Sequence, residues 1–208
     1  MFSSTVQATD AMMFSIAANK VPAAWERVAY PSLLPLGAWV ANLSERAKQL
    51  QEWCTDFQIP RVTWLSGLFV PQSFLTAVAQ SIAQRNDWPL EHTQIHTEVT
   101  KKTHDEIGAS ARDGAYVHGL WIEGARWDER MGCLDDQRPR ELHCRMPVLL
   151  LKAVNTHGQN SPSTERYLCP VYRTRQRGDT YVFSVDLRTK ASPSKWIMTG
   201  TAMILDAP

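Results

Sequence analysis

The spacing of the apolar residues divides the chain into a first part with a helical period and a second part with the period of strands. From Pro35 to Phe57 they recur every three or four positions, which predicts a long amphipathic helix. Trp39 and Trp53 lie on its apolar stripe, and we expect both to be core residues. Polar residues occupy the other side of this helix, which we expect to face solvent: Glu45, Arg46, Lys48, Gln49 and Glu52.

A second helix is predicted to begin at Pro71, because proline suits the first turn of a helix. Asn86-Asp87, before Pro89, is expected to end it. Its apolar stripe consists of Phe74, Leu75, Val78, Ala79 and Ile82. Between the two helices, the residues from Trp64 to Phe69 predict a turn packed by aromatic side chains.

The N-terminal segment has an unbalanced pattern. No lysine or arginine occurs as far as Asn19, and Met12, Met13, Ile16 and Ala17 fall at helical spacing. We therefore predict a helix with a strongly apolar side, which the rest of this chain or a larger body must cover. The apolar run is too short to span a bilayer, and no basic residue precedes it as in a signal peptide, so a soluble chain is expected.

After Pro89 the period becomes two, since Ile95, Thr97 and Val99 alternate with polar residues. In the clearest strand, Tyr181, Phe183, Val185 and Leu187 are expected to point to one side. The remaining strand candidates are Tyr116 to Glu123, Pro147 to Val154, Tyr167 to Tyr172 and Trp196 to Leu205. The loop from His157 to Thr164 is predicted to be a mobile hairpin.

These elements predict an α+β fold with the helices at the N-terminal side. We expect residues 1–91 to form a helical subdomain and residues 92–208 to form an incomplete antiparallel β-barrel of about six strands. Curling of the sheet into a barrel would hide its edges. A chain of 208 residues is long enough for one domain or for two small subdomains that share an interface.

Charge and cysteine content narrow the function. Twenty-two basic and 21 acidic residues give a net charge of +1, so nothing in the overall charge favours binding to nucleic acid or to an anionic membrane. The four cysteines are widely spaced, unlike the dense framework of a small secreted domain. A reducing, cytosolic setting is therefore expected.

The segment from Asp113 to Asp128 concentrates the candidate chemistry. His118, Glu123 and Asp128 are residue types used in acid/base sites, which leaves open a small barrel enzyme or ligand-binding module. On one continuous strand, however, His118 and Glu123 would face opposite sides of the sheet. The structural interpretation is favoured: a strand and a bend after it, with Arg126 paired to Glu123 or Asp128. Trp121 and Trp127 would be its packing anchors.

Sites for phosphate and for metal are not indicated. Gly119 and Gly124 match the spacing of neither the P-loop nor the dinucleotide fingerprint, so the domain is not expected to bind ATP by itself. The nearest candidate metal ligands lack the paired spacing of zinc sites: His92 with His96, His143 beside Cys144, and Cys133. We expect no metal and no cofactor.

Several longer stretches of sequence follow one another in a fixed order. The helical half contains Val21-Pro22, Tyr30-Pro31-Ser32, Leu36-Gly37-Ala38-Trp39, the residues from Trp64 to Phe69 and those from Pro71 to Ala77. The strand half contains residues 113–128, Met146-Pro147-Val148, Cys169-Pro170-Val171-Tyr172 and Lys195-Trp196-Ile197. In this order they resemble the C-terminal domain of dynein heavy chains. Trp88-Pro89-Leu90 and Gly114 to Gly119 most resemble axonemal heavy chains of the outer-arm β type.

The resemblance implies a piece from the C-terminal end of an ATP-driven microtubule motor for ciliary and flagellar beating. In that family the domain lies across the AAA+ ring and influences force and processivity, while the ring binds ATP and magnesium. The expected partners are the ring of the same heavy chain, and microtubules and other dynein chains for the whole motor. The expected location is the cytoskeleton of the axoneme, within the cytoplasm.

Two sets of residues acquire roles from the resemblance. The candidates for docking on the ring are Met12, Met13, Phe14 and Ile16. The second set is a structural signature without chemistry, and it consists of His118, Gly119, Glu123, Gly124, Arg126, Trp127 and Asp128.

Overall fold

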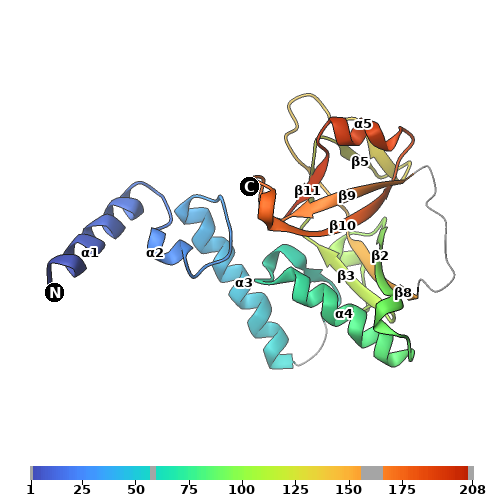
Figure 1. Cartoon of the computed structure of the whole chain (residues 1–208), viewed down its shortest axis with the longest axis horizontal. Helices are drawn as coiled ribbons and strands as arrows, with labels where there is room; N and C mark the ends of the chain where they lie inside the picture. Colours follow the sequence, from blue (N-terminus) through green and yellow to red (C-terminus); the bar gives the residue numbers. More distant parts are fainter. Residues whose placement is uncertain (1, 57–59, 156–165, 206–208) are drawn as a thin grey trace.

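The computed structural model describes residues 2–56, 60–155 and 166–205, with only the backbone described for residues 2–8 and 56. Helices dominate the N-terminal part and strands dominate the rest (Figure 1). The α-helices are α1 (Phe2–Ala17), α2 (Ala23–Glu26), α3 (Leu36–Asp56), α4 (Pro71–Arg85) and α5 (Pro193–Met198). The α+β class is confirmed.

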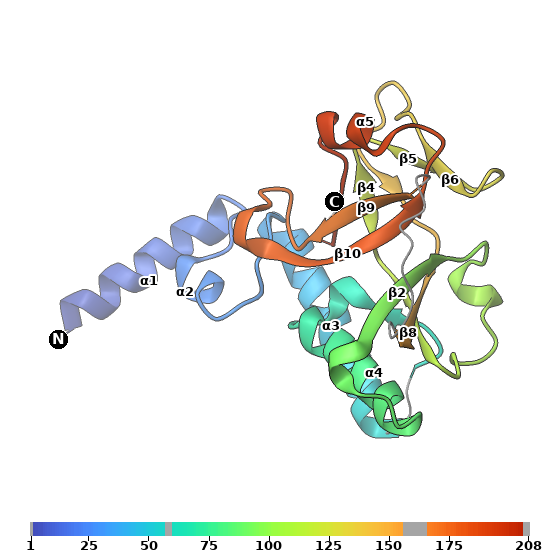
Figure 2. The same ribbon diagram turned by 45° about the vertical axis from the view of Figure 1, so that its right-hand side comes forward.

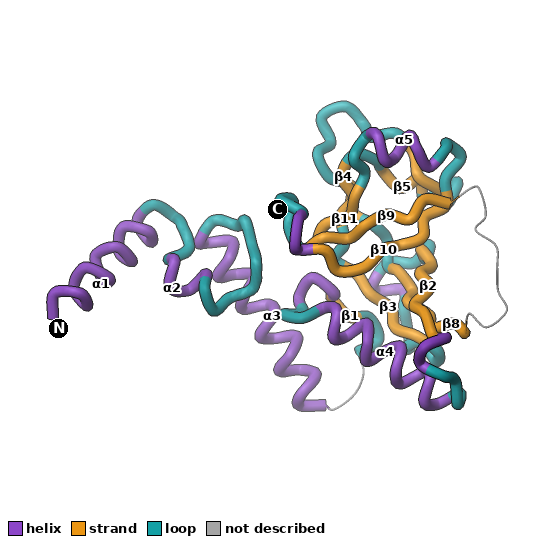
Figure 3. Tube along the Cα trace, in the orientation of Figure 1, coloured by secondary structure: helices purple, strands orange, loops and turns teal. Residues whose placement is uncertain are grey.

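The described strands form three sheets (Figure 3). One has the order β1-β3-β8-β2, with β1 (Thr63–Trp64), β3 (Gly114–His118), β8 (Leu149–Asn155) and β2 (Thr93–Val99). The second has the order β10-β9-β11-β4-β7, with β10 (Tyr181–Arg188), β9 (Arg166–Tyr172), β11 (Ala202–Ile204), β4 (Trp121–Glu123) and β7 (Cys144–Arg145). The third pairs β5 (Arg126–Asp128) with β6 (Cys133–Asp135).

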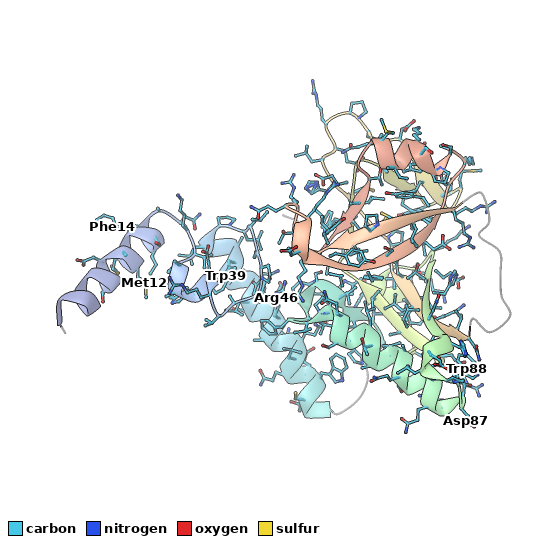
Figure 4. The ribbon with its side chains drawn as sticks, in the orientation of Figure 1. Met12, Phe14, Trp39, Arg46, Asp87 and Trp88 are labelled. Carbon is cyan, nitrogen blue, oxygen red and sulfur yellow. The ribbon has the colours of Figure 1, made fainter. Side chains whose placement is uncertain are left out.

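Both long helices occur where the sequence predicts them, although Phe57 lies outside the described residues. The α4 helix begins with Pro71 at its first turn and is followed by Asp87, whose φ is 55°. Asp87 and Trp88 lie at the end of α4 (Figure 4). The Trp88 N–H donates to the Ala83 carbonyl oxygen at 2.9 Å. Such a left-handed residue is a common helix end, and asparagine and aspartate tolerate it better than most residues.

The core lies between α4 and the two larger sheets. Leu65 and Leu75 from the helical half pack with Val117, Val171 and Val185 from the strands. Trp39 is buried as expected, while Trp53 is partly buried and packs on the edge of this core. Since β1 pairs with β3, the helical half also contributes a strand to the sheets. The boundary at residue 91 stays a prediction.

The strand expected from Tyr116 to Glu123 is interrupted. Gly119 has φ +89°, and a Cβ there would lie 2.3 Å from the Ser66 Oγ and 2.4 Å from the Trp64 Cδ1. The chain turns at this glycine, so that β3 belongs to the four-stranded sheet and β4 to the five-stranded sheet. The alternation of one continuous strand therefore does not describe His118 and Glu123.

The strand expected from Trp196 to Leu205 is wrong over its first half. Those residues form the end of α5, which begins with Pro193 in its first turn and is followed by Gly200 at φ +67°. Only Ala202–Ile204 pair as a strand, β11. Two residue types decided the result: proline favours a helix start, and glycine permits the left-handed turn after it.

One face assignment in β10 is also wrong. A register irregularity between Tyr181 and Phe183 adds a residue to this strand opposite β9. As a result, Val182 is buried together with Val185 and Leu187, and Tyr181 is 48% exposed. A bulge shifts the side-chain alternation by one position, and the hydrophobic pattern alone did not reveal it.

The expectation of about six antiparallel strands in a barrel needs correction. Eleven strands are described, and two pairings are parallel, β1 with β3 and β11 with β9. The described strands form no closed barrel. The hairpin expected at His157 to Thr164 lies outside the described residues.

Candidate docking surface and signature residues

The α1 helix projects away from the sheets, with α2 and the start of α3 between it and the body (Figures 1 and 2). Its apolar side chains are exposed: Met13 by 62%, Phe14 by 77% and Ile16 by 39%, while Met12 is partly buried. Met12 and Phe14 both lie on this projecting helix (Figure 4). The body of the domain thus leaves three of the four docking candidates open to solvent.

The ends of α1 lack the charged residues that would stabilise a helix. The helix has 16 residues, no acidic residue in its first turn and no basic residue in its last turn. Isolated helices of this length are marginally stable in water, and favourable charges at the ends are among the few local stabilising features. Packing of its exposed apolar side on a partner surface would therefore add stability to the helix.

An aromatic stack joins the projecting part to α3. The rings of Trp25 and Tyr30 both stack on Trp39, with centroid separations of 6.1 and 6.0 Å and interplanar angles of 22° and 13°. The guanidinium of Arg46 lies 3.7 Å above the Tyr30 ring. Trp39 and Arg46 lie on the part of α3 next to this junction (Figure 4).

The prediction that Arg46 faces solvent is wrong. Arg46 is only 4% exposed, and its Nη1 and Nε donate to the Leu68 carbonyl oxygen and to the Asn42 Oδ1. Gln49 also bonds to Trp64 through its side chain. Helical periodicity marks two sides of a helix, but it does not show that a polar side is covered by aromatic residues from elsewhere.

His118 lies at the end of β3, on the wall between two clefts. The larger cleft, of about 1070 Å³, separates α3 from β4 and β7, and the smaller one is about 420 Å³. The His118 ring meets the His104 ring edge-on, with centroids 5.1 Å apart. Burial, followed by the charges of His104 and Arg145, lowers the pKa of His118 to about 4. His118 is therefore neutral at physiological pH.

Glu123 has a different set of neighbours. Its Oε2 accepts a hydrogen bond from the Arg177 Nη2 at 3.0 Å, and its Oε1 lies 3.9 Å from the Arg175 Nε. The same Arg177 nitrogen donates to the Gly200 carbonyl oxygen at 2.8 Å. This ion pair ties β4 to the turn after β9 and to the turn before β11, which is a structural role.

Asp128 ends β5 and forms a local turn. Its Oδ1 accepts hydrogen bonds from the backbone N–H groups of Arg130 and Met131 at 2.9 and 3.3 Å. The hydrogen bond from Met131 is the main cause that lowers the pKa of Asp128. The ion pair expected for Arg126 with Glu123 or Asp128 does not occur among the described residues.

The structure does not assemble His118, Glu123 and Asp128 into one site. His118 lines two clefts, Glu123 is bound by arginines, and Asp128 caps a turn beside another hollow of about 300 Å³. Acid/base chemistry needs its groups within hydrogen-bonding reach of one substrate. Among the other signature residues, Gly119 and Gly124 have positive φ, and Trp127 is buried as expected.

Among the residues that the structure describes, no group of three or more histidine, cysteine, aspartate or glutamate side chains is arranged to hold a metal ion. No helix within residues 2–56, 60–155 and 166–205 is both long and apolar enough to cross a membrane.

The comparisons with known proteins agree with the resemblance seen in the sequence. A family model described as the C-terminal domain of the dynein heavy chain matches residues 4–205. The protein therefore belongs to this family.

Its relatives include motor heavy chains from cilia and flagella. The chain is 49% identical over 195 residues to the dynein beta chain of the flagellar outer arm of Chlamydomonas reinhardtii. It is 45% identical over 187 residues to a ciliary dynein beta chain of Heliocidaris crassispina and to dynein axonemal heavy chain 9 of Homo sapiens. These matches cover 94, 90 and 90% of the chain, but the chain spans only 4% of the length of each relative.

Proposed function

We propose that the chain is a regulatory and structural domain of an axonemal dynein heavy chain of the outer-arm β type, acting in the axoneme of a cilium or flagellum. The proposal is supported by the family match over residues 4–205 and by the names of the relatives. The whole heavy chain would bind microtubules and other dynein chains. This domain would modulate the force and processivity of that motor.

The observation that carries the proposed mode of action is the exposure of α1. Met13 and Phe14 are 62% and 77% exposed on a helix that is marginal without a partner. We propose that the AAA+ ring of the same heavy chain supplies the partner surface. Contacts that differ between ring states would favour some states over others, and this is how a domain without chemistry can affect a motor.

We also propose that the domain has no active site of its own, and that ATP and magnesium are bound only by the ring. The separation of His118, Glu123 and Asp128 supports this. Titration of the 208-residue chain with ATP and magnesium, followed by calorimetry, is expected to give no saturable binding. Saturable binding would remove this part of the proposal.

A further proposal concerns the two larger sheets, which we take to correspond to the incomplete barrel that the family resemblance implies. On one side, the Asp186 N–H of β10 donates to the Thr97 Oγ1 of β2 at 2.9 Å. On the other side, β1 and β7 lie at sheet edges along the cleft lined by Trp64 and Arg145. The two sheets are thus bridged between β10 and β2, and a cleft separates them between β1 and β7.

Docking is tested by placing a charge on the exposed apolar side of α1. Phe14→Asp in the intact heavy chain is expected to weaken the contact of the domain with the ring, because a carboxylate would have to be desolvated at the interface. Microtubule gliding velocity and stall force should change, while the ATP-binding residues of the ring are untouched.

The sequence offers a matched control. Met13→Asp on α1 and Met198→Asp on α5 make the same change at two exposed methionines, 62% and 86% exposed, at opposite ends of the molecule (Figure 1). We expect an effect on motility from Met13→Asp and little from Met198→Asp. Normal velocity and force in both α1 variants would refute docking through this helix.

A further inference from the structure

One residue both ends α1 and caps α3. Asn19 has a φ of 53°, and its N–H donates to the Ile16 carbonyl oxygen at 3.0 Å. The N–H of the next residue, Lys20, donates to the Ser15 carbonyl oxygen at 2.9 Å. This pair of hydrogen bonds is the Schellman arrangement that stops a helix at a left-handed residue. Asparagine is among the few residues other than glycine that adopt this conformation at small cost.

The two oxygen atoms of Asn19 face the start of α3. Its backbone oxygen accepts from the Leu36 N–H at 3.0 Å, and its Oδ1 accepts from the Gly37 N–H at 3.1 Å. Leu36 and Gly37 are the first two residues of α3, whose N–H groups have no partner within the helix. Asn19 thus supplies a cap from 18 positions earlier in the sequence.

A second contact restrains the same junction. The segment between the two helices passes through Trp25 and Tyr30, whose rings stack on Trp39 in the first turn of α3. The stack therefore holds the segment that follows α1, while the two hydrogen bonds accepted by Asn19 hold the end of α1 itself against the start of α3.

We propose that Asn19 is a positioning residue that presets the angle between α1 and α3 before α1 meets its partner. The inference rests on the proposed function for its purpose, since α1 is the proposed docking helix. A preset angle removes most of the ordering cost that a flexible arm would incur on docking. The angle itself is a property of this domain and can be measured without the ring.

The measurement is the distance between spin labels on the two helices in the 208-residue protein. Cys54 is naturally exposed on α3, and Asp10 is exposed on α1, so Asp10→Cys provides the second label. Cys144→Ser removes a partly buried thiol, and Cys133 and Cys169 are buried. We expect a single narrow distance distribution with Asn19 in place.

Three substitutions distinguish the effect of losing the side-chain cap on α3 from the effect of losing the left-handed turn at Asn19. Asn19→Ala loses the side-chain acceptor and disfavours the left-handed turn, whereas Asn19→Gly keeps the turn and loses only the acceptor. Both are expected to broaden the distance distribution. Asn19→Asp keeps an acceptor beside the N-terminus of α3 and is expected to restore the narrow peak.

Circular dichroism and thermal unfolding of each variant will show whether the body remains folded. If Asn19→Ala does not fold, the test rests on Asn19→Gly. An unchanged narrow distribution in Asn19→Gly would overturn the inference, and so would an Asn19→Asp distribution as broad as that of Asn19→Gly. These results do not depend on docking, which Phe14→Asp tests separately in the intact heavy chain.

Discussion

The side-chain amide of Gln49 pairs with both backbone groups of Trp64. The Trp64 N–H donates to the Gln49 Oε1 at 2.9 Å, and the Gln49 Nε2 donates to the Trp64 carbonyl oxygen at 3.2 Å. Trp64 belongs to β1, an edge strand of the four-stranded sheet. The amide from α3 takes the position that the peptide group of a neighbouring strand would take, so it closes this edge and ties α3 to the sheet.

Gln49→Ala is expected to lower the free energy of unfolding by about 1–2 kcal/mol, because it leaves the N–H and carbonyl groups of Trp64 without their partner. Water in the adjacent cleft can bond to these two groups, so the loss of stability should be smaller than at a site without water. Urea denaturation is the measurement. Gln51→Ala, at an exposed position of the same helix, is the control and should change stability little. Equal losses in both variants would contradict a specific role for Gln49.

Gly119→Ala is expected to destabilise the domain by about 3 kcal/mol or more, because a side chain there is strained in the backbone and also collides with neighbours. The new Cβ would lie 2.3 Å from the Ser66 Oγ and 2.4 Å from the Trp64 Cδ1. Thermal unfolding should show a large drop in Tm, or the variant should fail to fold.

Gly132→Ala is the matched control for Gly119. Its φ of +64° is also positive, but no heavy atom lies within 4 Å of the added Cβ. It should cost only about 1 kcal/mol, the backbone part of the penalty. If both variants lose the same stability, the close approach of the Gly119 backbone to Trp64 and Ser66 is not important.

His118 gives the stability of the domain a pH dependence with a definite sign. The pKa of His118 in the folded protein is about 4, below the ordinary value of 6.5. Between these two pH values His118 is protonated in the unfolded chain and neutral in the folded chain. The free energy of unfolding should therefore fall as the pH falls from about 6.5 to about 4. The group is partly exposed, so we expect a loss of about 2 kcal/mol rather than the full value of the shift.

Urea denaturation between pH 7 and 4 measures this loss. The charged groups that act on the pKa of His118 are His104 and Arg145, and both stay unchanged in His118→Gln. That variant should show a shallower pH dependence than the unsubstituted protein. His92→Gln, whose side chain is 41% exposed, should not. The same pH dependence in all three proteins would contradict a buried neutral His118.

The sequence determined the features that depend on neighbours along the chain. The period of its apolar residues gave α3 and α4, and Pro71 marked the start of α4 correctly. Alternation located β2, β8, β9 and β10, and several long stretches in order identified the family. The N-terminal apolar pattern also predicted a helix with a strongly apolar side, because amphipathicity is a local property. The exposure of that side is a result of the tertiary structure.

Only the tertiary structure decided which residues distant in sequence meet. It turned the chain at Gly119, paired Glu123 with Arg177 rather than Arg126, and buried Arg46 under Tyr30. It separated the three residues of the possible acid/base site and placed Asn19 on the start of α3. Periodicity specifies a face, whereas partners are fixed by sheet pairing and by the packing of one element on another, which depend on the whole sequence at once.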